Sequence, residues 1–470
     1  MNLRRWLTVG IGVKRWLVLA FAGLLLLALG MAHALRQVTA SLDPADPAEA
    51  VVGVLTFQWL PYQARGILLG GAGVALFLLG AYRLVRSLVD PFALLDRDQP
   101  MVEVIYQKRF LARGPKIVAI GGGTGLSTLL RGLKEHTSNL TAVVTVADDG
   151  GSSGVLRTEL GIPAVGDIRN CIVALADSEP LMGRLLQYRF PGSGPAVPTD
   201  PDPSKPEGAA GAAGVPLDGP FGAETGLGGH ALGNLLLAAL VQLEHGDFEQ
   251  GVREMNRVLA VRGQVVPATG TVLTMHARLA DGTEVQGQSR IARLSNLDRV
   301  WVTPEDVRPA GDALRAIADA DVIVLGPGSL FTSLLPALLV RGIAEAIAAS
   351  GAMVMFACNV ATQPGETAGY DLADHLDALA RHGVAHLPDV VLANNRFNAI
   401  APEGWHGQPV RLRWPPSERT SARLVLDDLV DPVNAHHHDP ERLAGAIIRA
   451  WGAEGGRRRR PSAARAQQSA

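Results

Sequence analysis

The sequence is poor in cysteine, in aromatic residues and in charge. It holds two cysteines, Cys171 and Cys358, among 470 residues, which is too few for a disulfide framework and offers no metal-ligand spacing. Both lie in apolar runs, so we expect buried thiols in a reducing compartment. The net charge is -2, whereas nucleic-acid binding calls for a basic excess, and we expect no nucleic-acid partner.

Two familiar catalytic signatures are also missing. The chain has neither the HExxH of zinc proteases nor the GxxxxGK[ST] of P-loop nucleotidases, so neither class is favoured. The run His436–His438 stands in a predicted exposed loop, where metal binding is an alternative to simple solvation.

Two long apolar segments are present near the amino terminus. Residues 16–35 contain no charged side chain, and residues 66–82 lie between Arg65 and Arg83, so each approaches the length needed to cross a bilayer. Lysine and arginine outside these spans predict that both ends face the cytoplasm. We therefore expect residues 1–90 to form a transmembrane helical hairpin in the cell inner membrane, as a multi-pass protein with its large domain in the cytoplasm.

A cleaved signal peptide is the alternative for the first apolar segment. Ala32-His33-Ala34 follows a basic start and an apolar core, which is the outline of a cleavage site. In that case the second apolar segment would still cross the membrane, and the large domain would still face the cytoplasm.

The rest of the chain alternates short apolar strands with helical patterns, which indicates an α/β fold whose parallel sheet is covered on both faces. After a linker at 91–115, we expect one domain at 116–430, and then a C-terminal segment at 431–470 that ends in a basic disordered tail. Residues 191–229 are crowded with proline, glycine and alanine, so we predict a disordered insertion. A hairpin is expected at 272–289. The predicted strands are 117–120, 142–146, 321–325, 352–357 and 390–393.

A glycine-rich turn follows the first of these strands. The run KIVAIGGGTGLSTLL, residues 116–130, leads from an apolar strand through four glycines into a helix. Free amides at a helix start, with the dipole behind them, bind phosphate, although glycines there also serve packing. The candidate ligand contacts are Gly121, Gly122, Gly123, Thr124 and Gly125.

An acidic, glycine-rich run follows the second strand. In ADDGGSSG, Asp148 and Asp149 suit either sugar hydroxyls or a Mg²⁺ held together with ligand phosphates, and Ser152 and Ser153 are further candidates. The alternative is an Asp-Gly turn with capping side chains.

Three further groups of polar residues are candidates. Asp167, Arg169 and Asn170 open a helix, where the aspartate could be a cap and the arginine could grip a phosphate. His230 and Asn234 lie four residues apart on one helical face. A second glycine turn and a polar loop after later strands add Gly328, Ser329, Phe331, Asn359 and Gln363.

Together these loops resemble the YvcK/CofD-like family, and specifically its YvcK (GlmR) branch, the gluconeogenesis factors. The resemblance rests on IGGGTGLSTLLRGLK, TVADDGGSSG, GDIRNCIVALAD, GHALGN, GPGSLFTS and CNVATQPGET and covers residues 116–395. It implies a Rossmann-like three-layer α/β/α fold. Phe331 stands where the family commonly has tyrosine, which puts one ligand contact in doubt.

The resemblance also implies a function. It predicts a regulator that binds a nucleotide-sugar such as UDP-N-acetylglucosamine and acts on cell shape and cell-wall precursor supply during gluconeogenic growth, with a partner enzyme of amino-sugar metabolism. The alternative is a CofD-like transferase of 2-phospho-L-lactate, which would use a nucleotide-diphosphate donor, Mg²⁺, and Asp149, Asp167 and His230 as catalytic groups. A dinucleotide-dependent oxidoreductase is less favoured, because GGGTG departs from GxGxxG.

Overall fold

The computed structural model describes residues 111–176, 180–191, 227–384, 386–398, 407–416 and 421–455, with the isolated positions 24, 61 and 64. The chain divides into two compact units, Met1–Phe110 and Leu111–Ala470, and the elements below belong to the second. The predicted membrane spans, nearly all of the predicted insertion and the basic tail lie outside the described residues.

Within the described residues, no single helix is both apolar and long enough to cross a membrane. One sharply bent pair of short helices, Leu330–Leu338 with Ile343–Ala349, passes the same test of length and composition. The pair is mostly buried within the domain, as expected of core helices.

A parallel sheet forms the centre of the domain. Its described strands follow the order β10-β9-β8-β7-β1-β2-β3, and each neighbouring pair is parallel. The bounds are β1 Ile117–Gly121, β2 Leu140–Val144, β3 Gln264–Pro267, β7 Val322–Leu325, β8 Met353–Ala357, β9 Val390–Asn394 and β10 Arg423–Asp427. The expected α/β fold with a mainly parallel sheet is confirmed.

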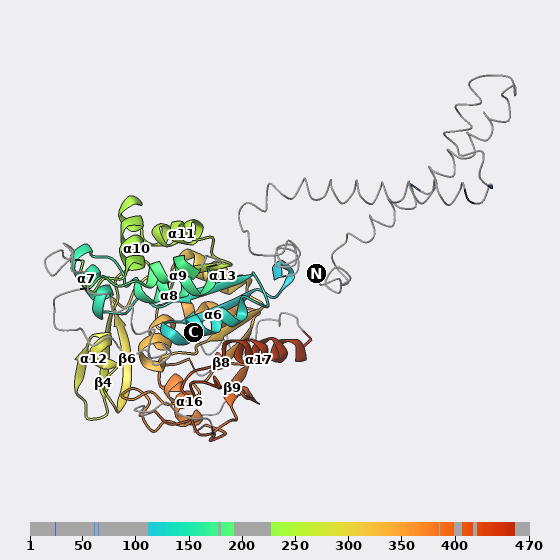
Figure 1. The fold of residues 1–470 in the computed structure, drawn as a ribbon. Coiled ribbons are helices and arrows are strands. Elements are labelled where there is room, and N and C mark those ends of the chain that lie inside the picture. Colours follow the sequence, from blue (N-terminus) through green and yellow to red (C-terminus); the bar gives the residue numbers. More distant parts are fainter. Residues whose placement is uncertain are drawn as a thin grey trace, which may run out of the picture. The chain divides into compact units, whose positions relative to one another are not determined.

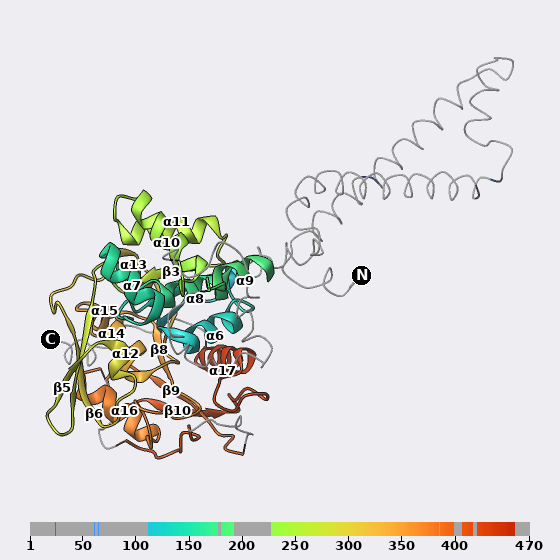
Figure 2. The same ribbon diagram turned by 60° about the vertical axis from the view of Figure 1, so that its left-hand side comes forward.

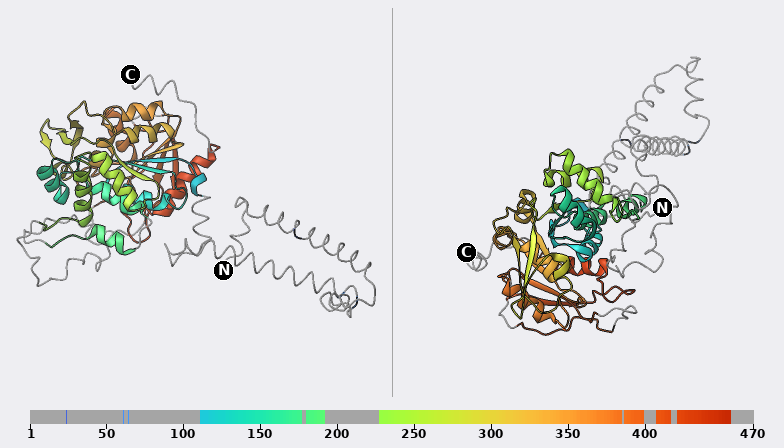
Figure 3. Two further views of the ribbon diagram at one scale, coloured as in Figure 1. Left: turned by 90° about the horizontal axis from the view of Figure 1, so that it is seen from above. Right: turned by 90° about the vertical axis from the view of Figure 1, so that its left-hand side faces the viewer.

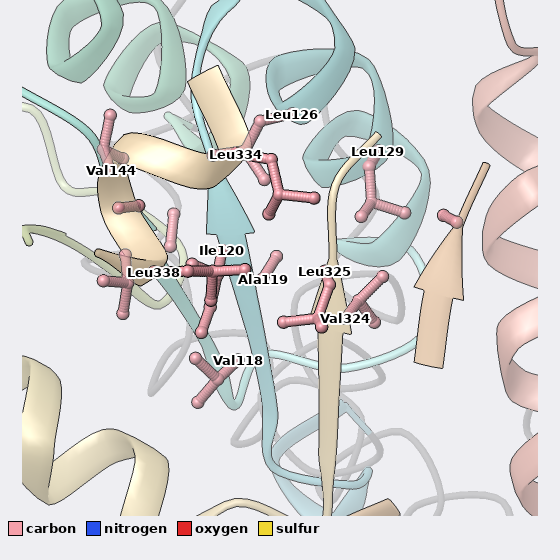
Figure 4. Packing of buried hydrophobic residues seen from close by; sticks show 14 of the residues in the cluster. Val118, Ala119, Ile120, Leu126, Leu129, Val144, Val324, Leu325, Leu334 and Leu338 are labelled. Carbon is pink, nitrogen blue, oxygen red and sulfur yellow. The ribbon is translucent and has the colours of Figure 1, made fainter. Parts of the chain in front are cut away.

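Strand β1 lies in the middle of the sheet and is buried along its whole length. Ile117 pairs with Leu140 of β2 on one side and with Val322 of β7 on the other. Figure 4 shows the side chains of Val118 and Ile120 among those of the neighbouring elements, including Leu126 and Leu338. Burial on both faces explains why this strand reads as a continuous apolar run.

Helices cover both faces of the sheet (Figures 1 and 3). On one face α6, α8 and α17 pack together, and on the other lie α13, α14 and α15. The bounds are α6 Gly123–Leu133, α7 Gly151–Leu160, α8 Gly166–Leu175, α9 Pro180–Gln187, α10 Leu232–Leu243, α11 Phe248–Val258, α12 Gln288–Ile291, α13 Gly311–Asp319, α14 Leu335–Leu338, α15 Ile343–Ala349, α16 Leu372–Arg381 and α17 Pro440–Ala453, with a 3₁₀ turn η2 Leu111–Arg113 and a π-helical turn η3 Leu330–Leu334.

A small antiparallel sheet stands beside the large one (Figures 1 and 2). It contains β4 Thr274–Leu279, β5 Glu284–Gln286 and β6 Leu297–Thr303 in the order β5-β4-β6. The predicted hairpin is confirmed, because β4 and β5 pair in antiparallel register. Strand β6 was not predicted.

The carboxyl-terminal part of the chain belongs to the same compact unit. Helix α17 packs on α6, and Leu443, Ala444 and Ile447 are buried there. At Gly132 of α6, a Cβ would lie 1.9 Å from the carbonyl oxygen of Pro440. The predicted boundary at 430 is therefore not a structural one, and order extends through α17.

Candidate ligand-binding site

The candidate residues gather at the carboxyl ends of the parallel strands. Chain order runs outward from β1 through β2 to β3 in one direction, and from β7 through β8 to β10 in the other. Strands β1 and β7 are neighbours, so the order of the sheet reverses between them. Open α/β sheets place their ligands at such a switch point.

The glycine turn after β1 is partly a packing device. A Cβ on Gly122 would lie 2.4 Å from Asp167 Oδ2, and one on Gly125 would lie 2.7 Å from the carbonyl oxygen of Pro327. Gly123 has a φ of 65°, which favours glycine. The first glycine turn therefore packs directly against the second glycine turn at Gly125.

The first turn of α6 nevertheless offers amides to a ligand. Thr124 is exposed and Gly125 is half-buried. Their N–H groups lie in the first turn of the helix, where no intrahelical partner exists. The helix itself therefore leaves the predicted phosphate-binding amides of Thr124 and Gly125 without a partner.

The two adjacent aspartates after β2 have different surroundings. Asp149 accepts hydrogen bonds from the amides of Gln288 (2.9 Å) and Ser289 (2.8 Å) and from the Ser289 hydroxyl (2.7 Å). It therefore caps α12 and ties this loop to the small sheet. Asp148 accepts from the amide of Gly150 at 2.9 Å, and burial raises its pKa.

This arrangement does not fit the expected magnesium site. Both oxygens of Asp149 accept hydrogen bonds from α12, so this carboxylate is engaged as a cap, and Asp148 is buried with a raised pKa.

Asp167 and Arg169 bring opposite charges into the interior at the start of α8. Burial, reinforced by the charge of Asp148, raises the pKa of Asp167 to about 7, while the Gly123 amide lowers it. Burial likewise lowers the pKa of Arg169 to about 10. One terminal nitrogen of this guanidinium donates to Asn170 Oδ1 at 2.8 Å. Arg169 is 7% exposed.

A buried network joins the start of α7 to the start of α10. Ser152 Oγ lies 3.0 Å from His230 Nδ1 and accepts a hydrogen bond of 3.0 Å from Asn234 Nδ2. Ser153 Oγ accepts from the Gly166 amide at 3.1 Å. The structure thus brings together the predicted DDGGSSG, GDIRN and GHALGN residues, which sequence alone could only order along the chain.

Three buried polar atoms around this network have no hydrogen-bond partner among the described residues. They are Thr145 Oγ1, Arg169 Nε and Asn234 Oδ1. Buried polar atoms are almost always paired in folded proteins, so each calls for an explanation. A bound polar ligand that both donates and accepts hydrogen bonds would pair these atoms and so explain them.

The second glycine turn is held in place by the loop after β8. Asn359 accepts from the Gly328 amide (3.1 Å) and donates to the Gly328 carbonyl (2.9 Å), while Gln363 donates to Ser329 Oγ at 2.7 Å. These two predicted ligand contacts therefore position the turn.

Phe331 differs more strongly from its expected role. Its ring is 0% exposed and packs edge-on against Tyr370 and His382. It belongs to the core, so its expected contact with a ligand is not found. Glu366 lies in the predicted polar loop but was not among the candidate ligand contacts. It accepts hydrogen bonds from the amides of Phe331 and Thr332 and caps the same turn.

Two other features were missed or misplaced. The run Gly150–Gly154 has the spacing of a GxSxG motif, and Ser152 contacts a histidine, but this serine stands inside the first turn of α7 and not on a strand-to-helix turn. The run His436–His438 was expected to be exposed, yet His438 is 7% exposed and burial lowers its pKa to about 3.

A cavity of about 400 Å³ lies elsewhere, beside the amino-terminal ends of β1, β2 and β3. Lys116, Asn139 and Gln264 are among the residues that line it. None of the candidate ligand contacts reaches it.

Comparison with known proteins agrees with this architecture. The family model described as "2-phospho-L-lactate transferase CofD" matches residues 117–408. A crystal structure of a protein from Bacillus halodurans superposes with a TM-score of 0.58 at 39% identity, over 72% of this chain and 100% of that one.

Curated relatives carry a different name. The "Gluconeogenesis factor" of Halalkalibacterium halodurans is 45% identical over 334 residues, which are 71% of this chain and 88% of that protein. The "Gluconeogenesis factor" of Bacillus subtilis is 44% identical over 286 residues, or 61% and 80% of the two chains. A relative from Nostoc sp. is 39% identical over 456 residues, which are 95% of this chain and 92% of its own length. The chain therefore belongs to the YvcK/CofD family, among the members named gluconeogenesis factors.

Proposed function

We propose that this protein binds a nucleotide-sugar of the UDP-N-acetylglucosamine type at the carboxyl ends of β1, β2 and β7, and that it acts as a regulator. Two observations support the proposal: the amides of Thr124 and Gly125 lie in the first turn of α6, which leaves them without an intrahelical partner, and Arg169 and Asn234 carry buried atoms without a hydrogen-bond partner. A diphosphate suits the amides, and sugar hydroxyls, which donate and accept, suit the unpaired atoms.

The regulatory role follows from the relatives' name. A gluconeogenesis factor that senses an amino-sugar nucleotide would adjust cell-wall precursor supply, and through it cell shape, by acting on a partner enzyme of amino-sugar metabolism.

Isothermal titration of the full chain with UDP-N-acetylglucosamine tests the proposal. We expect saturable binding that Asn234→Ala weakens, because that change removes both the unpaired Oδ1 and the Ser152 contact. Heat of dilution alone at millimolar ligand would refute it.

A second candidate function is favoured by the matching family model, which describes a 2-phospho-L-lactate transferase. In that case the same site would hold a nucleotide-diphosphate donor, with Asp167 and His230 near the reacting group. Product formation from such a donor with Mg²⁺, followed by chromatography and lost in His230→Ala, would favour the enzyme over the regulator.

We also propose that the apolar segments 16–35 and 66–82 anchor the chain in the inner membrane with the large domain in the cytoplasm. Alkaline extraction of membranes tests this anchor. Retention in the pellet supports it, and release into the supernatant contradicts it.

A further inference from the structure

An aspartate of the protein itself lies where a ligand phosphate would first meet helix α6. The Asp167 carboxylate faces the amide of Gly123, the first residue of that helix. It also lies so close to the turn that a Cβ on Gly122 would fall 2.4 Å from its Oδ2. The positive end of the α6 dipole therefore already faces an anion.

Two other carboxylates at the same edge of the sheet cap helices in a different manner. Asp149 receives three hydrogen bonds from α12, and Glu366 receives three from the turn after β7. Both are held by several donors and act as structural caps. No comparable set of bonds holds Asp167, for which the Gly123 amide is the donor found in the described residues.

The surroundings of Asp167 make its charge costly. Asp148 adds a like charge nearby, and burial removes solvent. Arg169 is the compensating cation, and its Nε is buried without a partner. This guanidinium is close enough to Asp167 to lower its pKa. Its unpaired buried nitrogen is an independent sign of an anion subsite, because such a nitrogen is costly unless a ligand uses it.

We infer that Asp167 is an internal competitor for the ligand phosphate. It occupies the Gly123 amide when the site is empty and yields it to a phosphate of a nucleotide-diphosphate ligand, which then also reaches Arg169 Nε. Asp167 thereby lowers affinity and excludes weak anions such as inorganic phosphate. The inference rests on the proposed nucleotide-sugar site and assigns to Asp167 a role opposite to that of a ligand contact.

The test compares the wild type with Asp167→Asn, which keeps the shape and removes the charge. Asp312→Asn is the matched control, since Asp312 also stands in the first turn of a helix, α13, outside the candidate site. Titrations use UDP-N-acetylglucosamine, inorganic diphosphate and uridine, which carries no phosphate.

At pH 8, where the wild-type carboxylate with its pKa of about 7 is mostly charged, we expect Asp167→Asn to bind the nucleotide-sugar and inorganic diphosphate about tenfold more tightly than the wild type, because the substitution removes a nearby like charge. Asp167→Asn should bind uridine with the same affinity as the wild type, and Asp312→Asn should match the wild type in its affinity for all three compounds. Asp167→Ala also removes the charge and should show the same increase in affinity. It replaces Asp167→Asn in the test if the asparagine variant is unstable.

The outcomes distinguish a failure of the competitor role of Asp167 from a failure of the proposed nucleotide-sugar binding. If the wild type binds the nucleotide-sugar and both Asp167 variants bind it equally or more weakly, the competitor role is overturned while the proposed function stands. If the wild type and the variants all fail to bind, the proposed function fails and the inference fails with it.

Discussion

Ser152 Oγ lies 3.0 Å from His230 Nδ1, although 78 residues separate the two along the chain. The contact joins the first turn of α7 to a residue two positions before α10, and Asn234 completes it. It fixes two helix starts against each other at the edge of the sheet where ligands bind in this class of fold.

Removing the serine hydroxyl should unpair two buried side chains at once. We predict that Ser152→Ala lowers the free energy of unfolding by about 1–2 kcal/mol, the usual cost of buried groups that lose a partner. Urea denaturation of Ser152→Ala, His230→Ala and the double variant measures the coupling. Additive effects of the two substitutions would contradict a shared network.

Glycine at position 125 is required by contact with the second glycine turn. Its added Cβ would meet the Pro327 carbonyl oxygen at 2.7 Å, so Gly125→Ala should cost about 1–3 kcal/mol as overpacking does. The control is Gly452→Ala in α17, where nothing lies within 4 Å and alanine should raise stability by about 0.5–1 kcal/mol. Equal stabilities of the two variants would show that the turns are not packed together.

Asp149 should behave as a cap and not as a metal ligand. Because α12 depends on its three hydrogen bonds, Asp149→Ala is expected to lower the free energy of unfolding by about 1–3 kcal/mol, whereas exposed Asp298→Ala should have little effect. Thermal unfolding with and without Mg²⁺ provides the measurement. A Mg²⁺-dependent stabilisation of the wild type that vanishes in Asp149→Ala would restore the metal role.

The raised pKa of Asp167 predicts a pH dependence with a definite sign. Its pKa is about 7 in the folded state, against an ordinary value of 3.8 for an aspartate in the unfolded chain. The folded protein therefore binds this proton more tightly and gains stability as pH falls from about 7 toward 4. Buried His438, with its pKa lowered to about 3, works in the opposite direction below about pH 6.5.

A comparison of variants separates the pH dependence of stability due to Asp167 from that due to His438. The advantage of Asp167→Asn in melting temperature over the wild type should grow between about pH 5 and pH 8, because the wild-type carboxylate becomes charged in that interval while the asparagine does not. A difference that stays constant with pH would mean that Asp167 titrates normally.

Much of the fold could be predicted because buried parallel strands are continuous apolar runs. The strands containing Ile120, Val324 and Val391 were placed correctly for that reason. Strands β3 and β10 were missed, since β3 begins with an exposed glutamine and ends in a proline, and β10 is a half-exposed edge strand. Neither strand is a continuous apolar run, which is the pattern that identified the others.

The candidate site was predictable in its members but not in their roles. Sequence order placed Asp149, Asn359 and Gln363 after strands, and the structure assigns them to capping and to holding a turn. Such roles depend on partners far away along the chain, as with Ser289, which lies 140 residues from Asp149. No local spacing contains that information.

The most direct test of this account is isothermal titration of UDP-N-acetylglucosamine into the wild-type chain and into Arg169→Ala. We predict saturable binding to the wild type and at least about tenfold weaker binding to the variant, because the substitution removes the buried guanidinium and with it the unpaired Nε donor. Equal affinities for the two proteins, or no binding to the wild type at millimolar ligand, would contradict it.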